Sequence, residues 1–135
     1  MTKKLKVLVV EDERITARCL YEDLKDLGVD PLNPVGKGET AIEVALNENP
    51  DLILMDIRLA GSMDGIEAAI KIHEKKRIPI VFMSGLATED IAEKAHKVDF
   101  LQFLEKPVTI DHLKPVINQL IKNLFKTVPP TTETD

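Results

Sequence analysis

The chain has 135 residues, of which 44% are hydrophobic and 30% charged, and its formal net charge is −5. This length and composition suit one globular domain and exclude a wholly disordered chain. No apolar run approaches the ~20 residues that span a bilayer, and the first residues lack the apolar stretch of a signal peptide, so we expect a cytoplasmic protein without a membrane partner. There is no Trp and no cluster of Lys and Arg, so direct nucleic-acid binding is not expected.

Five apolar runs, several rich in β-branched residues, alternate with five segments of helical periodicity. The expected strands cover residues 5–10, 31–36, 51–56, 78–83 and 100–104. The expected helices follow them, the first ending at Gly28 and the others covering about 39–47, 65–75, 88–96 and 109–125. Residues 127–135 are polar and proline-rich, which predicts a flexible tail or the start of an interdomain linker after a domain of residues 1–126.

The first and last helices each have an expected apolar side. In the first helix, Cys19 belongs to this side, so we expect it to be buried as a small hydrophobic residue. As the only cysteine, it excludes an internal disulfide and fits a reducing compartment. The expected apolar residues are Ile15, Cys19, Leu20, Leu24 and Leu27 in the first helix, and Leu113, Val116, Ile117, Leu120, Ile121 and Leu124 in the last.

Local signals refine the boundaries of these elements. Two prolines in 31–36 predict an edge strand. Asp64 and Thr88 are expected to cap the third and fourth helices. Pro115 is poorly suited to a helix interior, so the last helix has an alternative start nearer His112–Lys114. Strands that alternate with helices through short loops predict an α/β fold, in which a five-stranded parallel sheet is covered by helices on both sides.

Chemically distinctive residues follow the expected strands at the sheet edge where ligands of such folds bind. Glu11, Asp12 and Glu13 follow the first strand, Asp56 ends the third, Ser84 follows the fourth, and Lys106 follows the fifth. Carboxylates about 5 Å apart repel by about 3 kcal/mol at an effective dielectric of ~20. A hard divalent cation such as Mg²⁺ would offset this repulsion.

Each of these residues also has an ordinary structural interpretation. Glu11 and Asp12 could favour a helix N-terminus, Asp56 and Ser84 could be turn residues, and Lys106 could be a surface lysine. Their joint occurrence at the ends of the correct strands argues against these separate explanations.

The order and spacing of five short motifs resemble the receiver domains of response regulators. The resemblance covers residues 5–125 and implies a flavodoxin-like three-layer sandwich with strand order 2-1-3-4-5, for which a receiver is itself a standard example. The motifs are Val9-Val10-Glu11-Asp12-Glu13, Leu54-Met55-Asp56, Met63-Asp64-Gly65, Val81-Phe82-Met83-Ser84-Gly85 and Phe103-Leu104-Glu105-Lys106-Pro107.

The resemblance implies a phosphoacceptor and a metal site. Asp56 matches the aspartate that accepts a phosphoryl group, and Asp12 matches a direct ligand of Mg²⁺, for which Mn²⁺ can substitute. Glu11 matches the acid that acts through a metal-bound water. The backbone carbonyl of Arg58 matches a further protein ligand.

The resemblance also implies the residues of a switch. Ser84 matches the hydroxyl that hydrogen-bonds the phosphoryl group, and Lys106 matches the lysine that contacts it. Phe103 matches an aromatic residue that changes rotamer, and Lys106-Pro107 matches a cis peptide bond.

The implied partners are a sensor histidine kinase or a phosphotransfer protein, and an output domain or target protein that binds the fourth helix, fifth strand and fifth helix. A homodimer is a further expectation. Such a domain is a switch that catalyses only its own phosphorylation and dephosphorylation. The loop after Asp56 is one residue longer than in many receivers and lacks their usual proline, and we hypothesise that Arg58 in this loop alters the rate of phosphoryl loss.

Three alternatives are weighed. A haloacid-dehalogenase-type phosphatase needs a second aspartate two residues after the first, where this chain has Arg58. A flavin- or dinucleotide-binding domain needs a glycine-rich or hydroxyl-rich loop after the first strand, where this chain has Glu11-Asp12-Glu13. A degenerate receiver that only binds proteins is disfavoured, because the expected site residues are intact: Asp56, Asp12, Ser84 and Lys106. The histidines, His73, His96 and His112, lack metal-ligand spacing and are interpreted as structural or surface residues.

Overall fold

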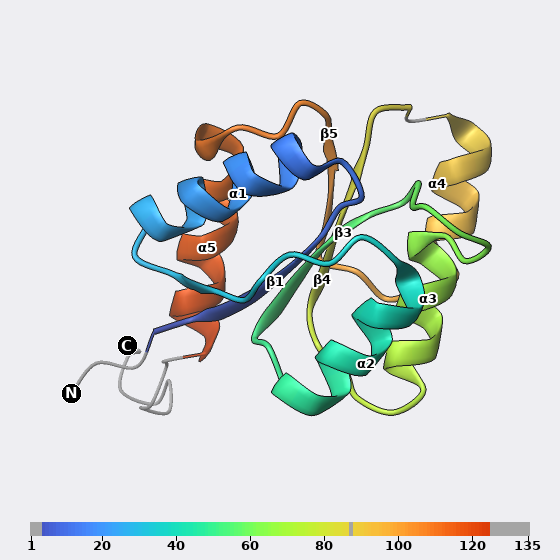
Figure 1. The fold of residues 1–135 in the computed structure, drawn as a ribbon, viewed down its shortest axis with the longest axis horizontal. Coiled ribbons are helices and arrows are strands. Elements are labelled where there is room, and N and C mark those ends of the chain that lie inside the picture. The colour runs from blue at the N-terminus through green and yellow to red at the C-terminus, as the bar shows by residue number, and fades with distance from the viewer. Residues whose placement is uncertain (1–3, 87, 125–135) are drawn as a thin grey trace, which may run out of the picture.

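The computed structural model describes residues 4–86 and 88–124, which form a parallel five-stranded sheet between two layers of helices (Figure 1). The strand order is β2-β1-β3-β4-β5, as the resemblance implied. The strands are β1 (Lys6–Val10), β2 (Asp30–Pro31), β3 (Leu52–Asp56), β4 (Ile80–Ser84) and β5 (Gln102–Glu105). The helices are α1 (Arg14–Asp26), α2 (Gly38–Glu48), α3 (Gly65–His73), α4 (Glu89–Ala95) and α5 (Ile110–Leu124).

The central strands are buried on both faces, which explains why their sequences are almost continuously apolar. Alternate residues of a strand point to opposite faces. In β1, Leu8 and Val10 pack with the cluster under α2, α3 and α4, whereas Val7 and Val9 pack with the cluster under α1 and α5. Figure 1 shows α1 and α5 on one side of the sheet and the other three helices on the opposite side.

Helix boundaries follow the local signals in the sequence. Gly28, just after α1, has φ +82°, a conformation that glycine adopts without steric cost. The Asp64 carboxylate accepts a hydrogen bond from the Glu67 amide, and the Glu67 side chain accepts one from the Asp64 amide, which together form a capping box. The Thr88 hydroxyl accepts a hydrogen bond from the Ile91 amide at the start of α4.

The expectation for the apolar side of α1 is partly wrong. Leu20 and Leu24 are buried, but Ile15 is 77% exposed and Cys19 is also exposed. The buried residues of α1 include Ala17 instead. An α-helix turns by about 100° per residue, so Ile15 and Cys19 point away from the side formed by Ala17 and Leu24. The expected single stripe was therefore too wide.

Two further expectations need correction. The second strand is shorter than 31–36, because only Asp30–Pro31 pair regularly with β1 and Val35 adds one isolated bridge; its edge position is confirmed. The last helix begins at Ile110 and contains Pro115, so the alternative start near 112–114 is wrong. Proline has no amide hydrogen to donate to the preceding turn. The helix continues through Pro115, which is exposed, because the other side of the helix is buried against the sheet.

The apolar side of α5 is narrower than expected, since Ile121 is 37% exposed. The side chain of Leu124 and the expected tail of residues 127–135 lie outside the described residues. Among the helices described, none combines the length and the apolar character needed to cross a membrane.

Candidate functional site

Three carboxylates meet at the carboxyl-terminal edge of the sheet. Glu11 and Asp12 directly follow β1, and Asp56 is the last residue of the neighbouring strand β3. One oxygen of each carboxylate lies within 4.8 Å of the other two. Glu11 and Asp56 are each 3% exposed, whereas Asp12 is exposed. The sheet thus forces two buried negative charges together with a third at the surface.

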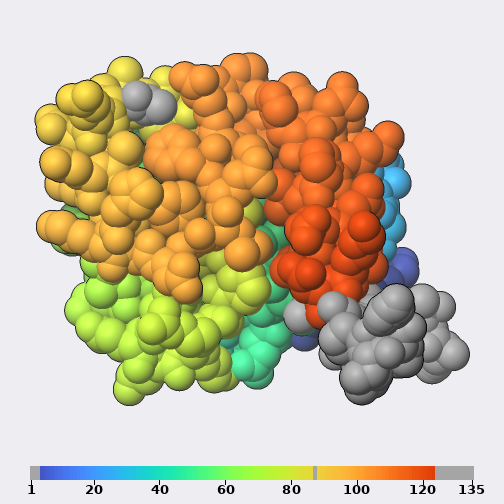
Figure 2. Space-filling view, turned by 180° about the vertical axis from the view of Figure 1, so that it is seen from behind, coloured from blue at the N-terminus to red at the C-terminus, as the bar shows by residue number. Residues whose placement is uncertain are grey.

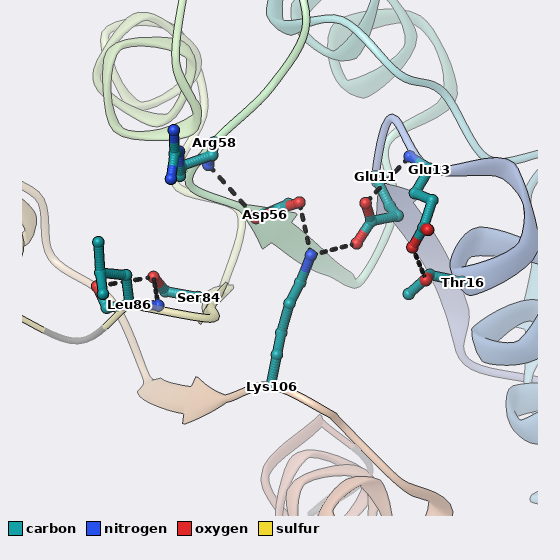
Figure 3. Close-up of polar contacts among 8 residues, drawn as sticks. All are labelled: Glu11, Glu13, Thr16, Asp56, Arg58, Ser84, Leu86 and Lys106. Carbon is teal, nitrogen blue, oxygen red and sulfur yellow. Dashed lines mark hydrogen bonds and ion pairs between the residues drawn. The ribbon is translucent and has the colours of Figure 1, made fainter.

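Lys106 joins the two buried carboxylates. Its Nζ atom lies 2.7 Å from Glu11 Oε1 and 2.7 Å from Asp56 Oδ2. Figure 3 shows the lysine side chain reaching from the end of β5 to a position between the two acids. Charge-assisted hydrogen bonds of this length are among the strong ones in proteins, so Lys106 offsets much of the repulsion between Glu11 and Asp56.

Backbone amides bind the second oxygen of each of these two carboxylates, the one that Lys106 does not contact. The Glu13 amide donates to Glu11 Oε2 at 3.0 Å, and the Arg58 amide donates to Asp56 Oδ1 at 3.3 Å. In Figure 3 it is the amide of Arg58, and not its guanidinium, that is directed at Asp56. Each buried carboxylate is therefore oriented by one side chain and one backbone group.

The electrostatic state of the cluster follows from burial and proximity. Burial raises the pKa of Glu11, and the nearby Asp56 charge acts in the same direction, against the hydrogen bonds from Lys106 and the Glu13 amide. Burial lowers the pKa of Lys106, but the hydrogen bonds and charges of Asp56 and Glu11 outweigh it, so the pKa rises overall. Lys106 is therefore a persistent cation beside Asp56.

Ser84 lies at the same edge but does not contact Asp56. Ser84 is 1% exposed. Its hydroxyl donates a hydrogen bond to the Leu86 carbonyl and accepts one from the Leu86 amide, each at 3.1 Å. Figure 3 shows this pair apart from the Lys106 cluster. The Lys106–Pro107 peptide bond is cis, as the resemblance implied. Phe103 is half-buried against the cluster under α2, α3 and α4.

Sequence reasoning assigned no role to Gly65, the first residue of α3. Its amide donates to the Ile57 carbonyl at 2.7 Å, so the start of α3 closes tightly on the end of β3. A Cβ atom added at Gly65 would lie 2.1 Å from the Asp56 carbonyl oxygen. Only glycine fits here, and the position of Asp56 depends on it. The Asp64 cap followed by a glycine was the available signal.

The three histidines lie away from the cluster. The His73 Nε2 atom is 2.8 Å from the Ile78 carbonyl oxygen, at the opposite edge of the sheet. His96 packs against the ring of Phe100, and His112 Nδ1 accepts from the Thr109 amide at 3.1 Å. Their structural interpretation is consistent with these contacts.

The donor set of the cluster fits a hard divalent cation. Mg²⁺ prefers oxygen ligands and is usually held by one or two carboxylates together with waters. Among the described residues, Glu11, Asp12 and Asp56 form the one group of three or more potential ligands close enough to share an ion. Neither sulfur nor imidazole is part of it, which disfavours softer metals.

Comparison with known protein sequences identifies the family of this chain. The family model for the response regulator receiver domain matches residues 7–118. The transcriptional regulatory protein PdtaR of Mycobacterium tuberculosis is 35% identical over 112 residues, which cover 83% of this chain and 54% of PdtaR. The luminescence regulatory protein LuxO of Vibrio campbellii is 37% identical over 120 residues, which cover 87% of this chain and 26% of LuxO. The chain thus spans about half or less of the length of these relatives.

Solved structures show the same fold. The signal receiver domain of a modulated diguanylate cyclase from Desulfovibrio desulfuricans superposes with a TM-score of 0.82 at 34% identity, covering 90% of this chain and 96% of that one. The receiver domain of the sensor histidine kinase PA1611 from Pseudomonas aeruginosa, solved with magnesium coordinated in its active-site cleft, has a TM-score of 0.79 at 26% identity, covering 88% and 98%. The chain belongs to the response regulator receiver domain family of two-component signalling.

Proposed function

We propose that this receiver accepts a phosphoryl group on Asp56 from a phosphohistidine of a sensor histidine kinase or a phosphotransfer protein. An oxygen of the Asp56 carboxylate forms a bond to phosphorus as the bond between phosphorus and the histidine nitrogen breaks. The observation that carries this proposal is the position of Lys106, whose ammonium group is bonded to Asp56 Oδ2. A fixed cation at this point stabilises the charge on the phosphoryl oxygens during transfer.

Glu11, Asp12 and Asp56 would hold a Mg²⁺ ion, and the backbone carbonyl of Arg58 is a further candidate ligand. The ion would supply additional positive charge for the phosphoryl oxygens, and Mn²⁺ would substitute for it. The magnesium in the structurally similar PA1611 receiver supports this assignment. The protein residues themselves orient the acceptor, because Lys106 and the Arg58 amide each hold one Asp56 oxygen.

Ser84 provides the proposed switch. Its hydroxyl is engaged with Leu86, and a phosphoryl group on Asp56 would offer it a stronger, charged acceptor. Movement of Ser84 would release the loop that leads to α4 and shift the half-buried Phe103. Figure 2 shows the face that would respond, where residues of the α4–β5 region (orange) lie between α4 (yellow) and α5 (red). An output domain, a target protein or a second copy of the chain would bind there.

Intact mass measurement tests the acceptor directly. Incubation with a small phosphodonor and Mg²⁺ should add one phosphoryl group to the wild type and none to the Asp56→Ala variant. Asp99→Ala removes an exposed aspartate at the opposite edge of the sheet and should still be modified. Absence of any adduct at all Mg²⁺ concentrations would instead support a domain that only binds proteins.

A further inference from the structure

The connection between β2 and α2 runs along the carboxyl-terminal edge of the sheet, beside the carboxylate cluster. Regular pairing of β2 with β1 ends at Pro31. Val35 then pairs once more with β1, because its amide donates to the Val9 carbonyl at 3.0 Å and its carbonyl accepts from the Glu11 amide at 2.8 Å. The four residues from Val35 to Gly38, which we call the strap, lead into α2 and lie in the cyan part of the chain in Figure 1.

The first half of the strap lies against the backbone that carries two of the acids. A Cβ atom added at Gly36 would lie 3.3 Å from the Cα atom of Asp12 and 3.7 Å from the Glu11 carbonyl oxygen. A Cα atom cannot swing aside as the end of a flexible side chain can, so the absence of a side chain at Gly36 allows this close approach. The strap therefore fixes the backbone position of Asp12.

The second half of the strap contacts the loop between β3 and α3, residues 57–64. Lys37 forms an isolated parallel bridge with Ala60. A Cβ atom added at Gly38 would lie 3.0 Å from both Cγ and Sδ of Met63, so the Met63 side chain packs closely against the buried Gly38 backbone. Two successive residues of the strap thus hold the middle and the end of this loop.

Arg58 lies between two attachment points of the same loop. The Ile57 amide donates to the Met83 carbonyl at 3.0 Å, which ties the start of the loop to β4, and Ala60 is tied to the strap. The Arg58 amide donates to Asp56 Oδ1, and the Arg58 carbonyl is a candidate metal ligand. The strap therefore connects the backbone of Asp12 to the segment that carries this carbonyl.

The strap is packed on one side only. On its other side, a hollow of about 630 Å³ separates it from α1. Residues 34–37 line one wall of this hollow, and Arg14, Ala17 and Arg18 of α1 line another. Because protein atoms do not fill this space, the strap can move towards α1 without a steric clash. Its position depends on the contacts with Asp12, Ala60 and Met63.

We propose that the strap is a positioning element for Mg²⁺, which holds the Asp12 carboxylate and the Arg58 carbonyl where both can reach one ion. This inference rests on the metal site of the proposed function and adds a means of regulating it. Residues that orient metal ligands without binding the metal contribute about tenfold or more to metal affinity in other proteins. Gly36, Gly38 and Met63 are positioning residues of this kind, since none of them supplies a ligand atom.

Metal binding and the position of the strap must then be coupled in both directions. If the closed strap raises the affinity for Mg²⁺ by some factor, bound Mg²⁺ favours the closed strap by the same factor. A protein that binds the exposed start of α2 and draws the strap away would therefore weaken the metal site. Phosphorylation, which uses the metal, would respond to events on a surface outside the carboxylate cluster.

The first test measures the Mg²⁺ Kd by titrating metal-free protein and following backbone amide chemical shifts. Gly36→Ala, which displaces the strap from Asp12, should raise the Kd about tenfold. Met63→Ala, which removes the contact with Gly38 at the other end of the strap, should also raise it, and Met63→Leu, which keeps the side-chain volume, should restore it. Ala45→Gly is the control, because it destabilises the buried side of α2 without touching the strap, and it should leave the Kd unchanged.

The second test reads the strap itself. In the wild type, saturating Mg²⁺ should slow hydrogen exchange at the amides of residues 36–38 by up to about tenfold, the limit set by the coupling. The amide of Gly28, at the amino-terminal edge, should exchange at the same rate with and without the metal.

Unchanged Mg²⁺ affinity in both Gly36→Ala and Met63→Ala would overturn the proposal and leave the metal site standing, as would an equal loss of affinity in Ala45→Gly. A wild type that binds no Mg²⁺ would overturn the metal site and the role of the strap together. A wild type that binds Mg²⁺ but gains no phosphoryl group from a small phosphodonor would overturn phosphorylation of Asp56 alone, and the affinities of the variants would still decide the role of the strap.

Discussion

The carboxyl-terminal and amino-terminal edges of the sheet differ in whether they bury polar side chains. The three buried polar residues of the described chain, Glu11, Asp56 and Ser84, all lie at the carboxyl-terminal edge. At the opposite edge, polar side chains mainly bond to the backbone, as where the Lys6 amide donates to Asp51 Oδ2 at 2.9 Å and Lys6 Nζ donates to the Glu48 carbonyl at 3.2 Å. Burial of a charge is costly, so its restriction to one edge marks that edge as functional.

The first prediction concerns the close contact between Gly65 and Asp56 at the carboxyl-terminal edge. Gly65→Ala should destabilise the protein by about 3 kcal/mol or more, since the new Cβ atom would meet the Asp56 carbonyl oxygen at 2.1 Å and overpacking against backbone is hard to relieve. Urea unfolding measures this loss. Gly85→Ala, where the nearest atom is 4.0 Å from the added Cβ, is the matched control and should change stability by less than about 0.5 kcal/mol. Similar costs at both glycines would contradict the tight closure of α3 on β3.

The second prediction removes the cation that balances the buried acids. Lys106→Met should cost about 1–3 kcal/mol, because it leaves Glu11 and Asp56 buried without their shared partner, and it should abolish or strongly slow phosphorylation. Urea unfolding and intact mass measure the two effects. In the Asp56→Asn background, where one of the two acids is neutral, the stability cost of Lys106→Met should be smaller. An unchanged cost in that background would show that Lys106 does not couple to Asp56.

The third prediction concerns the metal. At a Mg²⁺ concentration tenfold above its Kd, the free energy of unfolding should rise by about 1.4 kcal/mol through preferential binding to the folded state. Thermal unfolding with and without Mg²⁺ measures this gain, and chelation with EDTA should reverse it. Asp12→Ala should lose the gain, whereas Asp99→Ala at the other edge should keep it. A gain that survives in Asp12→Ala would place the ion elsewhere.

The smallest expected effect is kinetic. Arg58 follows Asp56 by two residues, its amide bonds to Asp56 Oδ1, and its side chain is exposed. Arg58→Ala should keep this backbone contact and change the rate of phosphoryl loss by about two- to fivefold, the range of one exposed charge interaction. Loss of the phosphoryl adduct over time, followed by mass, measures the rate. Arg77→Ala is the control at the opposite edge; identical rates for wild type and Arg58→Ala would refute a role for this side chain.

Some sequence patterns predicted the elements of this fold correctly, and others did not. The strands β1, β3 and β4 were predictable because continuous apolar runs of this length must be buried on both faces. Asp64 and Thr88 were predictable as caps because capping depends on residues three apart. The orientation of α1 was not predictable from its apolar residues, because Ile15 and Cys19 have the spacing of a stripe but lie outside the contact with the sheet.

For the candidate site, chain order alone was enough to bring the residues together, since parallel strands end at a common edge. The contacts within the edge were not available from the sequence. Lys106 was expected to contact a phosphoryl group, and the structure shows that it joins Glu11 to Asp56. Ser84 was expected beside that group, and the structure shows its hydroxyl bonded to Leu86. The Lys106 contacts join residues that are far apart in the chain, and the Ser84 contact depends on the rotamer of one side chain, so neither can be read from the order of the residues.

By itself, the sequence determined the parallel α/β fold and the placement of the acids, the hydroxyl and the lysine at one edge, because hydrophobic periodicity and the order of the elements along the chain can be read directly from it. Tertiary structure alone decided that Gly65 must lack a side chain, that Ile15 and Cys19 are exposed, and that Lys106 joins Glu11 to Asp56. The physical reason is that steric exclusion, burial and electrostatic proximity are set by packing between segments that the sequence separates.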